Sequence, residues 1–169
     1  MRSRTRRVGI ATAVAGLVGL TMTGPAHAEA PPPFSVLFPA GTACAFDVLV
    51  AGSGGNRVDR EFHDASGNLV RSISAGTGQA LTFTNLDSGA RYQTPSNGAV
   101  QHIQVNPDGT QTFTTTGHNI LILFPTDDPA GPSTTLYVGR VVFTVDGFGN
   151  FTLRSTAGSS VDVCAALST

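Results

Sequence analysis

Apolar and polar residues alternate along much of the chain in short runs, which is the period of β-strands that bury one face. Residues 45–50 show this clearly, with Phe46, Val48 and Val50 on the apolar side. Residues 119–124 are apolar at almost every position, which predicts a strand covered on both faces. Residues 134–146 form a long run rich in β-branched residues, and the last two segments together are the expected core of a small all-β domain.

Turn-forming residues divide the rest of the chain into short segments of strand length. In the segment 57–64, alternation places Val58 and Phe62 inward, and Arg57, Asp59, Glu61 and His63 outward. The pattern has no helical period, although residues 165–168 could form one helical turn. The predicted strands are residues 45–50, 57–64, 69–74, 79–85, 90–94, 99–105, 110–116, 119–124, 134–146, 151–154 and 161–164.

Strands of this number, joined by hairpin-sized turns, predict a single antiparallel meander domain that is either barrel-like or a sandwich. Of the two architectures we favour barrel-like closure. The expected all-β domain spans residues 44–169 of the chain.

Residues 1–28 have the features of a secretory signal peptide, with an arginine-rich start, an apolar run over residues 8–20 and the cleavage motif Ala26-His27-Ala28. An apolar run of about 13 residues is too short for a stable membrane anchor. We therefore expect cleavage after Ala28 and a secreted, extracellular protein with no stable membrane anchor. Residues 29–43 form a proline-rich segment with four prolines, and the triple proline 31–33 favours polyproline II over a packed element. The sequence leaves open that the apolar residues Phe34, Val36, Leu37 and Phe38 dock on the domain.

The charge of the chain bears on which partners it can bind. The chain has 169 residues, only 12% of them charged, and contains no lysine. Removing residues 1–28 removes four of ten arginines and none of the 11 acids, leaving a net charge of 6 − 11 = −5. A chain without a basic stripe is poorly suited to phosphate contacts, so the sequence argues against nucleic acid and against anionic membrane surfaces as partners.

Cys44 and Cys164 are the only cysteines of the sequence. In an exported chain an even pair of cysteines indicates a disulfide, here between the first and the last predicted strand. The alternatives are two buried thiols or a redox site, but redox pairs usually lie close together in sequence. We expect one structural disulfide.

Candidate catalytic groups are few. His63, His102 and His118 would bind zinc only if they converged, and the expected hairpin places His118 about 17 Å beyond His102. Asp127 and Asp128 follow the most apolar strand and could serve a hydrolase or bind calcium, although no calcium-loop motif is present. The sequence assigns no catalytic, cofactor-binding or metal-binding residue, and it leans against an enzyme.

Three segments of the sequence together resemble a known group of proteins. The string 119–146, the early Cys44-Ala-Phe-Asp47 and the ending 161–168 are together similar to small secreted β-proteins of actinobacteria whose function is not assigned. The resemblance implies an exported, disulfide-linked β domain from a Gram-positive host. It implies no catalytic or binding residues.

These observations predict a non-enzymatic extracellular module for binding or interaction. The alternative is a β-barrel that binds or isomerises a small apolar ligand, because some of the ten phenylalanines would then line an unfilled interior.

Overall fold

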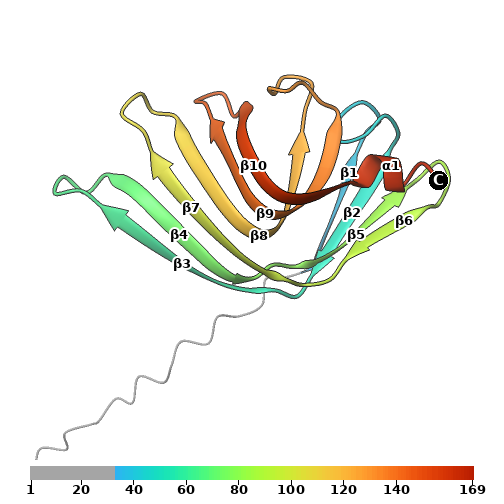
Figure 1. The fold of residues 1–169 in the computed structure, drawn as a ribbon, viewed down its shortest axis with the longest axis horizontal. Coiled ribbons are helices and arrows are strands. Elements are labelled where there is room, and N and C mark those ends of the chain that lie inside the picture. Colours follow the sequence, from blue (N-terminus) through green and yellow to red (C-terminus); the bar gives the residue numbers. More distant parts are fainter. Residues whose placement is uncertain (1–32) are drawn as a thin grey trace, which may run out of the picture.

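A computed structural model describes residues 33–169, which form an all-β domain with one short helix (Figure 1). The predicted signal peptide lies outside the described residues. The elements are β1 (Phe34–Phe38), β2 (Val48–Ser53), β3 (Asn56–His63), β4 (Leu69–Thr77), β5 (Ala80–Asn85), β6 (Arg91–Thr94), β7 (Gly98–Val105), β8 (Gln111–Leu123), β9 (Ser133–Val145), β10 (Phe151–Asp162) and α1 (Val163–Ala166).

The strands make two antiparallel sheets. A four-stranded sheet has the order β1-β2-β5-β6, and a six-stranded sheet has the order β10-β9-β8-β7-β4-β3. The predicted antiparallel all-β class is therefore confirmed. The preference for barrel closure is wrong, because among residues 33–169 the strand ladders end at open edges and the arrangement is sandwich-like.

Where the two sheets meet, the pairing of neighbouring chain segments continues from one sheet into the other. β2 and β3 follow each other along the chain and pair with β5 and β4 respectively, while β6 and β7 pair with the other sides of those strands. β7 pairs with β8 only as far as Gly117, after which β8 continues beside β9 alone. The sheets thus diverge at this point, and β8–β10 curve away from the four-stranded sheet (Figure 1).

A row of small residues crosses the six-stranded sheet where it bends. Gly76 of β4 faces Ala99 of β7, Ala99 faces Gly117 of β8, Gly117 faces Gly139 of β9, and Gly139 faces Gly158 of β10. The four glycines all have positive φ, between 95° and 144°. Because side chains rarely tolerate this conformation, the glycines let neighbouring strands bend together without breaking the ladder.

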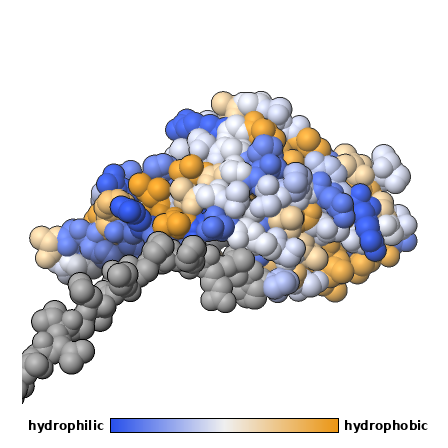
Figure 2. Space-filling view, turned by 90° about the horizontal axis from the view of Figure 1, so that it is seen from below, coloured by the Kyte–Doolittle hydropathy of each residue, from blue (hydrophilic) through white to orange (hydrophobic). Residues whose placement is uncertain are grey.

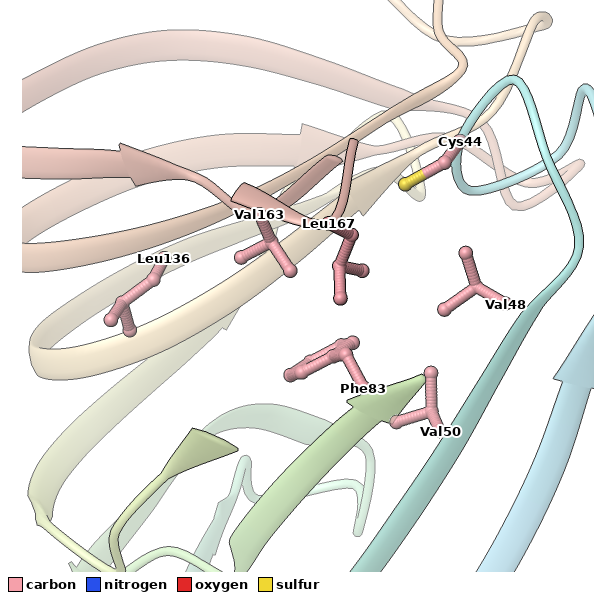
Figure 3. Close-up of a cluster of buried hydrophobic side chains, with 7 residues drawn as sticks. All are labelled: Cys44, Val48, Val50, Phe83, Leu136, Val163 and Leu167. Atoms are coloured by element: carbon pink, nitrogen blue, oxygen red, sulfur yellow. The ribbon is translucent and has the colours of Figure 1, made fainter. Parts of the chain in front are cut away.

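The main core lies between the four-stranded sheet, β9 and α1, and includes Phe83, Leu136 and Leu167 (Figure 3). The predicted disulfide is present here and joins Cys44 to Cys164, with a Cα–Cα distance of 5.6 Å. It fixes the chain entering β2 to the short helix that follows β10. The whole cluster consists of Cys44, Val48, Val50, Phe83, Leu136, Val163 and Leu167.

The buried Asn85 ties the end of β5 to the last turn of the chain. Its side-chain nitrogen donates to the carbonyl of Leu167 at 3.0 Å, and its side-chain oxygen accepts from the backbone N–H of Asp87 at 2.9 Å. The amide thus connects β5 to a residue 82 positions further along the chain. The helical turn predicted at the C-terminal end begins earlier than expected, at Val163.

A second core cluster lies on the opposite face of β8 and β9, around Leu121, Leu123 and Val141. Phe143 stacks between two other phenylalanines, with ring centroids 4.8 Å from Phe113 and 5.3 Å from Phe151. Ile120 packs against the first cluster while its neighbour Leu121 belongs to the second. The prediction that residues 119–124 are buried on both faces is therefore confirmed for this part of β8.

Residues 34–38 form β1, an edge strand beside β2, so the apolar residues after the prolines dock on the domain, as the sequence left open. One expectation about β3 was wrong. Val58, expected inward, is 56% exposed, whereas Arg57 and Asp59, expected outward, line the inner side of the sheet. Glu61 and His63 are exposed as expected.

The outer surface carries apolar and polar residues side by side. Seen from below, hydrophobic and hydrophilic patches alternate across the molecule (Figure 2). The exposed large hydrophobic residues include Val58, Val70 and Phe148, which belong to different strands and turns. Within residues 33–169, no helix has the length and apolar character needed to span a membrane.

Candidate functional site: a cavity where the sheets diverge

The divergence of the two sheets leaves a cavity of about 630 Å³. Its wall comes from β3, β4 and β7–β9 of the six-stranded sheet, and from β1, β5 and β6 of the four-stranded sheet. The glycine row passes beside this space, since Arg57 of β3 is paired with Gly76 and the cavity-lining Thr77 follows that glycine. The apolar lining residues are Phe34, Leu81, Ile120, Leu121, Leu136, Val141 and Phe143.

Polar side chains also line the cavity. Arg57 is half-buried and Asp59 exposed on β3, Gln101 is half-buried on β7, and Asn119 and Tyr137 are half-buried where β8 pairs with β9. Threonine, histidine and further amide side chains also line the cavity, yet apolar atoms make up most of its surface, as in small-molecule sites where a few polar groups fix the orientation of the ligand.

Arg57 is held in place by one residue of the neighbouring strand. Its Nε donates to the Ser74 hydroxyl at 2.9 Å and its Nη2 donates to the Ser74 carbonyl at 3.1 Å. Within residues 33–169, no carboxylate lies within ion-pair distance of this guanidinium. The positive charge is therefore fixed in position without a protein counter-ion.

Asn119 contributes an unsatisfied donor. Its Nδ2 is buried and has no hydrogen-bond partner among the residues that the structure describes. Such an atom costs about 1–3 kcal/mol, because it has given up water without gaining another acceptor. An acceptor brought by a ligand would remove this cost.

The three histidines do not form a metal site. His102 faces Thr114 across the β7–β8 ladder, and His118 lies four residues further along β8. His63 forms an ion pair with Glu61, with 3.7 Å between the Nε2 and Oε2 atoms. His118 is exposed at the cavity. In the described part of the chain, no group of three or more histidines, cysteines or acids is placed to hold a metal ion.

Asp127 has a structural role in the proline-rich loop. One carboxylate oxygen accepts from the N–H of Phe124 at 2.6 Å, and the other accepts from the N–H of Phe151 at 2.8 Å. The buried carboxylate thus connects the end of β8 to the start of β10. Asp128 adds backbone hydrogen bonds to Phe151 and Leu153. The contacts of Asp127 explain its burial without any catalytic role.

Sequence reasoning raised an unfilled interior only as an alternative and did not place the cavity, because alternation identifies the polar face of a strand without showing whether that face points inward. Arg57 and Asp59 were assigned to solvent on polarity alone, yet the curvature of the sheet turns their face inward. The signal that would have located the site is the set of glycines within strands, because it marks the bend.

Comparison with protein-family models, curated proteins and solved structures finds no match for this chain.

Proposed function

We propose that this protein is a non-enzymatic extracellular binding protein that holds a small, mainly apolar molecule in the cavity between its sheets. Export after cleavage at Ala28, and membership of the small secreted actinobacterial proteins it resembles, are part of this proposal. The disulfide is compatible with secretion.

The cavity is the observation that carries the proposal. Its volume of about 630 Å³ falls within the roughly 300–1,000 Å³ of ordinary small-molecule sites. Seven apolar residues from four strands contribute to its wall. A fully packed interior would have left only the outer surface for binding.

The test uses the neutral fluorescent probe N-phenyl-1-naphthylamine, which brightens in apolar surroundings. The chain contains no tryptophan, so the unmodified protein contributes no indole emission. We expect saturable binding to the wild-type protein. Gln101→Trp, which places a large ring in the cavity, should weaken this binding by about tenfold, equivalent to about 1.4 kcal/mol.

The matched control is His102→Trp on the next residue of β7, whose side chain is exposed and does not line the cavity. This variant should bind the probe like the wild type. Equal affinity in both variants, or no saturable binding to the folded wild-type protein, would contradict the proposal. Circular dichroism of each variant establishes that it is folded.

A further inference from the structure

We infer that the ligand of this cavity is an apolar molecule that carries a single carboxylate, and that Arg57 binds that carboxylate. The inference rests on the proposed function, because it names the chemical class of molecule that the same cavity accepts. It arises from the charges and unsatisfied donors of the wall rather than from the size of the cavity.

The hydrogen bonds of Arg57 leave a suitable edge of the guanidinium open. Ser74 accepts from Nε and Nη2, which occupies the side edge of the planar group. The remaining N–H groups on Nη1 and Nη2 form the end edge, whose geometry matches the two oxygens of a carboxylate. Ser74 therefore orients Arg57 before a ligand arrives, which reduces the ordering cost of binding.

Burial distinguishes Arg57 from the opposite charge on the same strand. Arg57 is half-buried, whereas Asp59 is exposed, and the two side chains form no ion pair within 4.0 Å. Removing a charge from water is costly unless a counter-ion compensates, so Arg57 gains more from a ligand charge than Asp59 does. The other titratable side chains that line the cavity are the exposed His118 and the half-buried Tyr137.

Asn119 points to a second feature of the ligand. Asn119 lines the cavity three strands away from Arg57 in the order β3-β4-β7-β8, and its buried, unsatisfied Nδ2 becomes available to a ligand when the amide rotates toward the cavity. Three strand spacings correspond to about 14 Å along a flat sheet, and curvature shortens that distance. A carbonyl or hydroxyl oxygen remote from the carboxylate would satisfy it, with apolar atoms lying between the two polar groups.

The experiment compares two probes that differ only in their end group, which is a charged carboxylate in one and a neutral amide in the other. 1-Naphthylacetate and 1-naphthylacetamide share a ring and a chain length, and each is titrated against protein loaded with N-phenyl-1-naphthylamine. We expect the acid to displace the fluorescent probe at a concentration at least about tenfold lower than the amide, because charge-assisted hydrogen bonds are the stronger kind. The preference should also decrease with added salt.

Arg57→Met should abolish the preference for the acid over the amide, with each displacement measured relative to that variant's own affinity for N-phenyl-1-naphthylamine. The control Arg60→Met removes the same charge from an exposed residue of β3 that does not line the cavity, and the preference should persist. Asp59→Asn should strengthen binding of the acid. If Arg57→Met does not fold, Arg57→Lys is the substitute, since it keeps the charge but loses the planar edge. Its preference for the acid over the amide should be weaker than that of the wild type but still present.

Equal displacement by acid and amide in the wild type, or an unchanged preference in folded Arg57→Met, would overturn the inference and leave the cavity as a neutral apolar site. Failure of the neutral probe to bind would instead refute the proposed function itself. The two failures are therefore distinguishable.

Discussion

Gly117 and Gly139 face each other across the β8–β9 ladder, both with positive φ, at the point where the six-stranded sheet bends. A Cβ atom at Gly117 would overlap the carbonyl oxygen of Gly98, and one at Gly139 would overlap that of Ala157. Both contacts involve backbone of the neighbouring strand, which cannot move aside alone. The bend that opens the cavity therefore depends on glycine at these positions.

Gly139→Ala should lower the free energy of unfolding by about 1–3 kcal/mol, because alanine is strained at this φ and meets the neighbouring backbone. Urea denaturation followed by circular dichroism measures the change. The control is Gly147→Ala in the β9–β10 turn, where nothing lies within 4 Å of an added Cβ. A Gly139→Ala variant as stable as the control would show that the row is not required for the bend.

The disulfide should be a major contributor to stability. Cys44 and Cys164 are separated by 120 residues, and closing a loop of that length restricts the unfolded chain by about 4–5 kcal/mol in the chain-entropy model. The Cys44→Ala/Cys164→Ala variant should therefore unfold at a much lower urea concentration than the oxidised wild type. An unchanged midpoint would mean that packing of the cluster around Phe83 and Leu167 suffices.

Stability should decrease in acid because three turns hold ionised aspartates. Hydrogen bonds from the Asn68 side chain lower the pKa of Asp64 below its ordinary 3.8, and those from Asn150 do the same for Asp146. The Thr110 hydroxyl lowers the pKa of Asp108. A lowered folded-state pKa stabilises the protein above the unfolded value, and this contribution is lost as the pH falls through the folded value.

The measurement is the urea midpoint from about pH 6 to about pH 2 for the wild type and for Asp64→Asn/Asp146→Asn. The wild type should lose stability as the pH falls below 3.8, the ordinary pKa of an aspartate in the unfolded chain. The double variant should show a shallower decrease, since its amides do not titrate. Because all three carboxylates are at exposed turns, the difference should be modest, and parallel curves would contradict the assignment.

Local alternation was sufficient to predict most of the strands. The run 134–146 coincides with β9 within one residue at each end, and the segment 99–105 coincides almost as well with β7. The disulfide followed from the count of two cysteines. These features depend on near neighbours in sequence or on a single pairing, so one sequence contains the information.

Features that depend on the meeting of distant strands were not predictable. Residues 110–116 and 119–124 were expected as two strands, but β8 runs through Gly117 without interruption, because the glycine bends the strand instead of ending it. β10 likewise continues through Gly158. The cavity and the inward side of Arg57 follow from these bends, and no periodicity along one strand reports them.

The link between Cys44 and Cys164 closes residues 44–164 of the described domain into a covalent ring, and β1 lies outside this ring. A single cut by a protease at an exposed turn inside the ring, for example at Phe148, which is 94% exposed, opens the ring without releasing a fragment. Both pieces stay bonded through sulfur, and every strand remains tethered to its neighbours. The domain can thus be nicked once and still remain one molecule until a reductant separates the halves.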